Sequence, residues 1–257
     1  MRIAIFSDIH ANLPALQAFF QDLEIQKPDA VYCLGDLVGY NIWPNEVVRE
    51  IQKRGIPTIA GNYDQGIGLH IDECGCAYKT EEDKAMGKIS ISYTNEIVGV
   101  EERKYLRNLP SQIRVEFVLN EHKFSLLLVH GSPRKINEYL FEDREESSMM
   151  RIMEQSNADI LCFGHTHKPY HRILQTENES GVRYRHAINT GSVGKPKDGD
   201  NRGGYVIIEL DEHSSVYRKE SISVAFIRFE YDVESAAKAV ENSPLPDAYA
   251  DMLRKAY

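Results

Sequence analysis

Short apolar runs that end in metal-ligating residues recur along this chain of 257 residues. The runs IAIF, AVYCL, PTIA, FSLLLV and ADILCF have the length and composition of buried strands. Seven residues with oxygen or imidazole ligands follow them closely: Asp8, His10, Asp36, Asn62, His130, His165 and His167. Ligands in open α/β sheets bind outside the carboxyl ends of the strands. The pattern therefore predicts that five strand ends bring these side chains to one rim, as a metal centre.

The spacing and chemistry of these residues favour two ions rather than one. Asp8 and His10, like His165 and His167, are two residues apart, which in an extended segment puts both side chains on one face. Carboxylate and amide oxygens suit hard divalent ions, and imidazole suits Zn, Fe and Ni as well. Two Asp, one Asn and four His exceed what one ion can use, so we expect two ions about 3.5–4 Å apart that share a carboxylate. Any one of these residues alone could equally be a turn former, a helix cap or a surface residue.

Residues 1–60 read as strand, helix, strand, helix, strand, and this alternation predicts a parallel sheet with right-handed crossovers. The helices are expected over Pro14–Glu24 and Asn45–Arg54, where apolar residues recur at helical spacing. The polar stretch 65–109 lies between two ligand-bearing strands, so we expect it to be an insertion that borders the site.

The rest of the chain predicts further helices and many strands, and we expect a single domain over residues 1–257, built on two packed sheets. Expected helices lie near Glu81–Gly87, Val100–Leu109, Asp143–Ser156, Glu234–Val240 and Pro246–Ala256. Expected strands are VEFVL and KFSLLLV, joined through Asn120–His122, then His171–Gln175, Gly181–Ile188, Gly204–Leu210 and Val224–Tyr231, with a polar turn at Glu177–Gly181.

Charge and composition narrow the classes of partner. The net charge is −9, and Lys and Arg nowhere occur in longer runs than pairs, so a long nucleic acid is not expected as a partner. A small phosphoester fits better, because bound metal ions supply local positive charge. No window approaches the roughly 20 apolar residues of a membrane span, and the N-terminus reads as a strand rather than a signal peptide. We therefore expect a cytoplasmic protein without a membrane partner; a homo-oligomer is left open.

The four cysteines do not predict a disulfide framework in a chain of this length. Cys33 and Cys162 lie inside apolar runs and are expected to be inert core residues. Cys74 and Cys76 flank Gly75, and no second pair of zinc ligands is near. We expect a reduced loop there; a place near the substrate opening is the alternative.

The ligand motifs, taken in order, resemble the calcineurin-like metallophosphoesterase superfamily. Its pattern of D-x-H, G-D, G-N-H-D/E, H and G-H-x-H reads here as Asp8-Ile9-His10, Gly35-Asp36, Gly61-Asn62-Tyr63-Asp64, His130 and Gly164-His165-Thr166-His167. The likeness covers roughly residues 1–210, and FSDIHANLPAL, CLGDLVGY, HGSP and NTGSVGKP look like its small bacterial and archaeal branch. It implies an α/β (α+β) fold: a four-layer αββα sandwich with two mixed sheets and the metal site at the carboxyl ends of the strands.

The resemblance also implies roles for the seven residues. Asp8, His10 and His167 would hold the first divalent ion, Asn62, His130 and His165 the second, and Asp36 would bridge both. A metal-bound hydroxide would attack the phosphorus of a small phosphomonoester or phosphodiester, since such ions lower the pKa of water from 15.7 to about 7. The metal could be Mn, Fe, Ni or Zn.

One position departs from the family pattern, because Tyr63 replaces the histidine of G-N-H-D that often protonates the leaving oxygen. A phenol with a pKa near 10 is a weaker acid than imidazolium, although it can still donate a hydrogen bond. Asp64 would orient its neighbour, or else act as a turn carboxylate. The catalytic candidates are thus Asp36, Asn62, Tyr63 and Asp64. Asn12, Tyr63 and Arg134 are candidate substrate contacts, although Arg134 could equally be solvated.

The expected function is therefore that of a metal-dependent phosphoesterase. The alternative is a non-catalytic scaffold of the same fold that binds metal and serves protein interaction, as in a retromer subunit that resembles these enzymes. The tyrosine in place of the histidine keeps this alternative open. A nuclease is the third hypothesis, which the acidic net charge and the lack of interleaved aromatic and basic residues disfavour.

Overall fold

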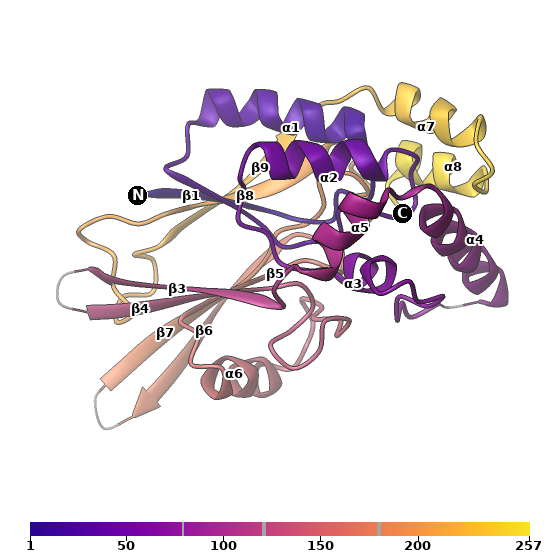
Figure 1. Ribbon diagram of the computed structural model, residues 1–257. Coiled ribbons are helices and arrows are strands. Elements are labelled where there is room, and N and C mark those ends of the chain that lie inside the picture. Colours follow the sequence, from indigo (N-terminus) through magenta and orange to yellow (C-terminus); the bar gives the residue numbers. More distant parts are fainter. Residues whose placement is uncertain (79, 120–121, 179–180) are drawn as a thin grey trace.

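Two β-sheets form the centre of the molecule (Figure 1). The computed structural model describes residues 1–78, 80–119, 122–178 and 181–257, with only the backbone for His122 and Asn178. The first sheet has the order β2 (Ala30–Cys33), β1 (Arg2–Phe6), β8 (Gly203–Glu209), β9 (Ser223–Phe229). The second has the order β3 (Gln112–Leu119), β4 (His122–Val129), β5 (Ile160–Phe163), β7 (Gly181–Asn189), β6 (Tyr170–Asn178). The helices are α1 (Leu13–Gln26), α2 (Pro44–Lys53), α3 (Asn62–Gly68), α4 (Glu81–Ile97), α5 (Val100–Arg107), α6 (Glu146–Gln155), α7 (Val233–Glu241) and α8 (Ala248–Lys255).

Both sheets are mixed, as predicted. β1 pairs in parallel with β2 and antiparallel with β8, which in turn pairs antiparallel with β9. In the second sheet β5 is parallel to both β4 and β7, whereas the edge strands β3 and β6 are antiparallel to their neighbours. The α/β class and the two-sheet sandwich expected from the sequence are confirmed.

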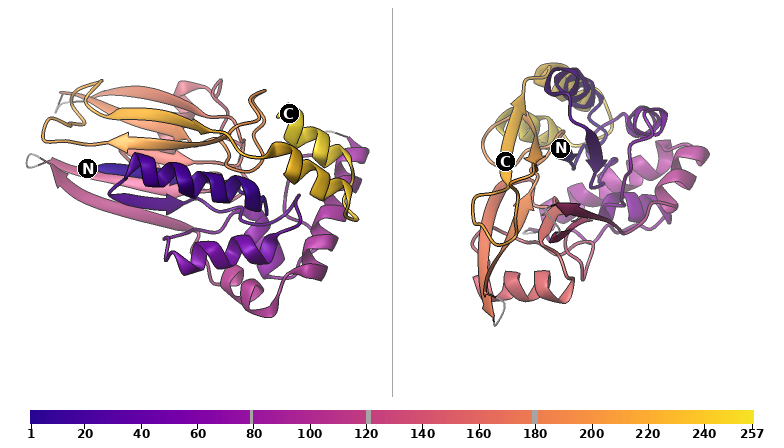
Figure 2. Two further views of the ribbon diagram at one scale, coloured as in Figure 1. Left: turned by 90° about the horizontal axis from the view of Figure 1, so that it is seen from above. Right: turned by 90° about the vertical axis from the view of Figure 1, so that its left-hand side faces the viewer.

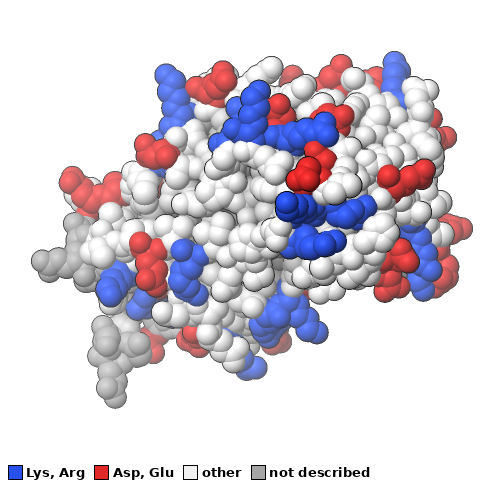
Figure 3. All heavy atoms as spheres, viewed as in Figure 1, with Lys and Arg blue, Asp and Glu red and all other residues white. Residues whose placement is uncertain are grey.

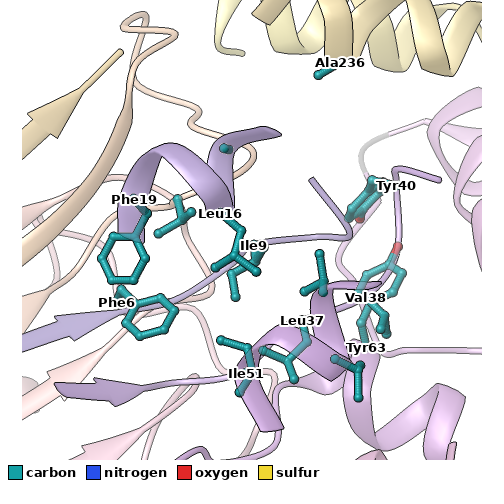
Figure 4. Packing of buried hydrophobic residues seen from close by; sticks show 14 of the residues in the cluster. Phe6, Ile9, Leu16, Phe19, Leu37, Val38, Tyr40, Ile51, Tyr63 and Ala236 are labelled. Carbon is teal, nitrogen blue, oxygen red and sulfur yellow. The ribbon is translucent and has the colours of Figure 1, made fainter. Parts of the chain in front are cut away.

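The side chains of β1 alternate between two separate cores, because successive residues of a strand point to opposite faces. Ile3 and Ile5 lie in the core between the two sheets. Phe6 points the other way and packs with Leu16 and Phe19 of α1 (Figure 4). This second core lies between the first sheet and the helices α1, α2, α7 and α8.

The same alternation in β4 defines the third core. Leu126 and Leu128 join the core between the sheets, whereas Leu127 and Val129 pack with Met149 of α6 on the outer face of the second sheet. Three cores therefore separate four layers in the order helices, sheet, sheet, helix (Figures 1 and 2). In the described part of the chain no helix is both long and apolar enough to cross a membrane.

The two helices predicted in the first 60 residues are present as α1 and α2. The Asn12 side chain caps α1, since its Oδ1 accepts a hydrogen bond from the Ala15 amide at 3.2 Å. The helix ends at Lys27, which adopts a left-handed conformation with φ of 50°. Pro44 opens α2, where its missing N–H costs nothing.

The expected helix near Glu81–Gly87 is ten residues longer in the structure and runs to Ile97. Its second half carries buried polar residues, which hide the apolar periodicity. The Ser90 hydroxyl accepts a hydrogen bond from the Tyr40 amide, and the Thr94 hydroxyl donates to the Ser90 carbonyl four residues back. Hydrogen bonding to a distant loop thus takes the place of apolar packing.

The prediction of a strand at PTIA is wrong. Only Thr58 forms an isolated parallel bridge, with Cys33 of β2, and no strand includes this segment. Pro57 has no N–H to donate, and the Ala60 amide leaves the ladder to bond the Pro110 carbonyl. Asn62 therefore follows a bridged segment and opens α3 rather than ending a strand.

Most of residues 65–109 lie at one end of the molecule, on the right in Figure 1, where α3, α4 and α5 gather near α8 (Figure 2, left). That this stretch is an insertion within one domain of residues 1–257 stays a prediction. Two expected turns lie at least partly outside the described residues. These are the turn through Asn120 and Glu121 and the centre of the turn at Glu177–Gly181.

Candidate metal centre

The structure brings the seven predicted side chains together at that same end, where four strands finish. Asp8 follows β1, Asp36 follows β2, and His130 follows β4 directly. His165 and His167 follow β5. Together with Asn62 at the start of α3, all seven are buried. Their role as metal ligands stays a prediction.

The prediction that each pair of ligands lies in an extended segment is wrong. Asp8 and His10 do not lie in an extended segment: both have left-handed backbones, with φ of 56° and 50°. His165 and His167 behave alike, with φ of 66° and 59°, and Asp36 has φ of 54°. Non-glycine residues in this region are uncommon and cluster at functional sites. Sharp turns after the strands, rather than the alternation of a strand, aim these side chains inward.

Three of the residues, Asp8, His10 and His167, form one compact group in which potential ligand atoms face one another. The Nε2 atoms of His10 and His167 are 3.2 Å apart, with nearly stacked rings. Asp8 Oδ1 lies 3.3 Å from His167 Nε2 and 3.8 Å from His10 Nε2. A single cation could contact all three atoms.

A second group consists of Asp36, His130 and His165, with Asn62 beside them. Asp36 Oδ2 lies 3.3 Å from His130 Nε2 and 3.6 Å from His10 Nε2, so this carboxylate faces both groups. The Asn62 side chain is oriented by its own donor, because Nδ2 bonds the Cys74 carbonyl at 2.7 Å. Its Oδ1 consequently points at His130 Nε2, 3.0 Å away.

Backbone carbonyls fix the histidine tautomers. The Nδ1 atoms of His10, His130 and His167 each lie within hydrogen-bond distance of a carbonyl, those of Val38, Leu34 and Lys195 respectively. A carbonyl can only accept, so each Nδ1 carries a proton, and the neutral rings of His10 and His167 each present an Nε2 lone pair to the centre. His10 and His167 therefore oppose two lone pairs at 3.2 Å. Such a contact needs a cation between the nitrogens.

The charge states fit this interpretation. Burial lowers the pKa of His10 and of His165 to about 3, so both rings are neutral. Burial alone would raise the pKa of Asp8, but the nearby imidazoles, first that of His167, hold it well below its usual range. Burial alone would lower the pKa of His130, but Asp36 and then Asp8 raise it to about 9. A metal ion would compete with that proton.

Two buried acceptors of the candidate centre, Asp8 Oδ1 and His165 Nε2, have no hydrogen-bond partner in the described structure. Unpaired buried polar atoms cost free energy. Both atoms belong to the groups just described, and both are good ligands for divalent transition metals. The donor set thus fits metal ions of the Mn, Fe, Ni or Zn kind.

Two glycines of the sequence motifs are required by the packing of the carboxylates. A Cβ on Gly61 would lie 2.1 Å from Asp36 Oδ1, and one on Gly164 would lie 2.4 Å from Asp8 Oδ2. No side chain fits at either distance. The glycines therefore allow neighbouring backbone to close around the two carboxylates.

Tyr63 and Asp64 take different places. Tyr63 lines the hollow of ≈ 10 Å³ over the centre, with its ring centroid 5.5 Å from that of His10. Burial raises its pKa well above the ordinary value, so the phenol keeps its proton. Asp64 Oδ1 accepts from the Leu37 amide and Oδ2 from the Gly61 amide, at 2.8 and 3.0 Å. Both oxygens of Asp64 are thus used to hold backbone, as in a turn carboxylate.

The two other candidate substrate contacts do not reach the hollow. Asn12 caps α1, and its Nδ2 donates to the Gly194 carbonyl at 2.8 Å. Arg134 forms an ion pair with Glu138 and lines a different surface depression. That either contacts substrate stays a prediction.

Sequence reasoning missed several residues around the centre. Tyr40, Cys76, Tyr139 and Lys197 line the hollow with the candidate ligands. Cys76 thus occupies the place near the opening that was the less favoured alternative, whereas Cys33 and Cys162 are buried and free as expected. Burial lowers the pKa of Lys197, as it does that of Lys195. The NTGSVGKP segment, which contains Lys195 and ends just before Lys197, was the only signal for these lysines.

The other described histidine side chains lie outside both groups. His70 and His213 are exposed. His171 and His186 pair with each other, Nε2 to Nδ1 at 2.9 Å, on neighbouring strands β6 and β7. The His122 side chain is outside the described part.

Comparisons with known proteins agree with this geometry. The sequence profile of the calcineurin-like phosphoesterase superfamily domain matches residues 1–213. An uncharacterised protein of Methanocaldococcus jannaschii is 29% identical over 260 aligned residues, which cover 98% of this chain and 96% of that protein. A UDP-2,3-diacylglucosamine hydrolase of Vibrio cholerae is 24% identical over 199 residues, 66% of this chain and 81% of the relative.

Among solved structures, a metallophosphoesterase from Sphaerobacter thermophilus superposes with a TM-score of 0.73 at 27% identity, with 100% of both chains covered. That structure aligns with the whole chain, and the profile match includes all seven candidate ligands and the described strands up to β8. This chain belongs to the calcineurin-like phosphoesterase superfamily.

Proposed function

We propose that this protein is a phosphoesterase that hydrolyses a small phosphomonoester or phosphodiester at a centre of two divalent metal ions. The observation that carries the proposal is the contact between His10 Nε2 and His167 Nε2 at 3.2 Å. Both rings donate from Nδ1 to carbonyls and burial lowers the pKa of both, so only a cation makes this contact favourable. Membership of a superfamily of phosphoesterases supports the same chemistry.

Each residue of the cluster has a definable task. Asp8, His10 and His167 would hold one ion, Asn62, His130 and His165 the other, and Asp36 would contact both. Two ions bound there would make water available as a nucleophile at neutral pH and stabilise charge on the phosphoryl oxygens. The carbonyls behind the imidazoles fix the ring orientations, and the left-handed turns hold the ligands in place before substrate arrives.

Tyr63 would act as a hydrogen-bond donor rather than as a general acid. Its raised pKa makes proton transfer to a leaving oxygen unfavourable, but the protonated phenol can still donate. Among the described residues its hydroxyl meets no partner at hydrogen-bonding geometry, although Tyr40, Tyr78 and Cys76 lie around it. We therefore expect esters with good leaving groups to react fastest.

The surface agrees with a small substrate. On the face shown in Figure 3, acidic and basic side chains are interspersed, and the basic ones do not merge into one stripe along the described residues. A protein that tracks a nucleic-acid backbone normally presents such a stripe.

The test uses the full-length protein reconstituted with Mn²⁺, Ni²⁺ or Zn²⁺. We expect about two metal ions per chain by elemental analysis and metal-dependent hydrolysis of bis-p-nitrophenyl phosphate or p-nitrophenyl phosphate. Asp36→Asn should lower kcat by at least about 100-fold, whereas Asp143→Asn, which removes an exposed carboxylate, should not. Stoichiometric metal without turnover of either ester would favour the scaffold alternative instead.

A further inference from the structure

A larger cavity adjoins the candidate metal centre. Its volume is ≈ 350 Å³, and it shares Tyr40, Cys76, Tyr139 and Lys197 with the hollow over the ligands. A group held at the centre would therefore lie beside this cavity. We call it the side cavity.

Two lysines without a carboxylate partner line the side cavity. Lys195 is only 3% exposed; its Nζ lies 4.8 Å from the centroid of the Tyr40 ring and 3.4 Å from Met252 Sδ. Lys197 is half-buried beside it. Within the described residues neither forms an ion pair, and Asp83, the acidic residue that lines the cavity, caps α4 through the Thr80 amide.

Lysine amines in such a position need an explanation, because burying their charged form without a partner is costly. Carboxylates outnumber basic groups in this chain, 39 Asp and Glu against 30 Lys and Arg, yet among the described residues none forms an ion pair with these two lysines, and Asp8 and Asp36 act on Lys197 only from a longer distance. An anionic group of a ligand would supply the missing partner.

The walls of the side cavity are mostly aromatic and thioether groups. The rings of Tyr40, Tyr78, Tyr139 and Tyr249 line it, together with the side chains of Met86 and Met252. Flat aromatic faces stack well on planar rings, and thioethers pack favourably against them. The walls therefore favour a planar aromatic group.

Part of the wall of the side cavity comes from residues outside the family's sequence profile. Tyr249, Met252 and Tyr257 lie beyond the profile match, which ends at residue 213. Met86 belongs to α4, which lies at the same end of the molecule as α8 (Figures 1 and 2). A family-wide centre bordered in part by walls from outside the family profile is the arrangement expected of a specificity site.

We propose that the side cavity selects the substrate: it binds the part of the phosphoester outside the reacting phosphate, and this part carries a planar aromatic ring and a second anionic group. This inference rests on the proposed function. Lys195 and Lys197 would bind the second anion, and the tyrosines would contact the ring.

Three probes separate the two features. Adenosine 3′,5′-bisphosphate has the ring and a second anion, adenosine 5′-monophosphate has the ring alone, and ribose 5-phosphate has neither. With the metal-loaded full chain, kcat/KM should fall about tenfold at each step in that order. Equal values for the three probes would overturn the inference.

Matched variants assign the effect to residues. Lys195→Met should lower kcat/KM for the bisphosphate about tenfold or more and leave that for the monophosphate within about threefold. Lys197→Met, at a half-buried position, repeats the test should the first variant fold poorly. Lys135→Met removes the same charge from an exposed position away from the cavity and should change neither value. Tyr78→Leu should reduce the preference for adenosine 5′-monophosphate over ribose 5-phosphate.

A binding measurement keeps the inference separate from the proposed function. The lysines and tyrosines need no metal, so calorimetry with the metal-free protein should detect the bisphosphate, and Lys197→Met should weaken that binding about tenfold. Hydrolysis of p-nitrophenyl phosphate without discrimination among the three probes would refute the side cavity alone. Selective binding of the bisphosphate without hydrolysis of any ester would support the side cavity and refute the proposed function.

Discussion

Gly164→Ala tests whether the packing around Asp8 builds the candidate centre. The added Cβ would lie 2.4 Å from both Asp8 Oδ2 and Ser7 Oγ, whereas ordinary contacts begin near 3.4 Å. The methyl group must therefore push the carboxylate by about 1 Å. Asp8 Oδ2 also accepts hydrogen bonds from Ser7 Oγ and the His165 amide, at 2.5 and 3.0 Å, and both would be strained.

Two quantities should change. Overpacking of this kind costs about 1–3 kcal/mol of unfolding free energy, which lowers Tm by about 2–4 °C for each kcal/mol in a chain of this size. Displacement of Asp8 from its position 3.3 Å from His167 Nε2 should weaken Mn²⁺ binding about 10–100-fold. Calorimetric titration with Mn²⁺ and thermal unfolding with and without the metal measure the two effects.

The matched control is Gly204→Ala in β8. The nearest atom to its added Cβ would be Arg228 Nη1 at 3.2 Å, the far end of a flexible side chain. We expect its unfolding free energy to change by no more than about 0.5 kcal/mol, with unchanged Mn²⁺ affinity. If Gly164→Ala also bound Mn²⁺ as tightly as the unmodified protein, the assignment of Asp8 to the centre would be wrong.

Two further predictions concern stability. Leu126→Ala, in the core between the sheets, should lower the unfolding free energy measured in urea by about 2–5 kcal/mol. Ile25→Ala, at a position 75% exposed, should lower it by less than about 0.5 kcal/mol. Equal losses would contradict the assignment of Leu126 to the core between the sheets. Burial, and then His171, lower the pKa of His186 from 6.5 to about 3 in the folded protein. As the pH falls below 6.5, this histidine takes up a proton in the unfolded chain but not in the folded protein. The folded state therefore loses the stability that it has above pH 6.5. Between pH 7.5 and 5.5 this residue should lower the unfolding free energy by about 1.4 kcal/mol. His186→Phe should therefore reduce the change in unfolding free energy over this pH range by that amount. An unchanged pH dependence in the variant would show that the ring is not held neutral.

The sequence was sufficient for the parts of the molecule that local patterns encode. Strands β1, β2, β4 and β5 are short apolar runs, and the residues that follow them could be read as candidate ligands because the carboxyl ends of neighbouring parallel strands lie together. The order of the motifs also carried the family resemblance. The strand at PTIA failed because a proline and a distant carbonyl, that of Pro110, interrupt its ladder.

The geometry of the centre depended on contacts between residues far apart in the chain. The carbonyl that orients His167 belongs to Lys195, and the sulfur and carbonyl that orient Asn62 belong to the Cys74–Cys76 loop. Local spacing suggested extended pairs, whereas packing imposed left-handed turns on Asp8, His10 and Asp36. Such strain persists only where surrounding structure holds it, and that structure is absent from a local window of sequence.

By itself, then, the sequence determined which chemical groups this protein places after its strands, because apolar runs and their neighbours are local features. Only the tertiary structure decided which nitrogen lone pairs of the histidines face each other. It also decided that Lys195 and Lys197 lie near the centre, beside tyrosines from α8 and from the loop after β2. The physical reason is that burial and hydrogen-bond partners are set by long-range packing, and these fix the charge and direction of every group in the site.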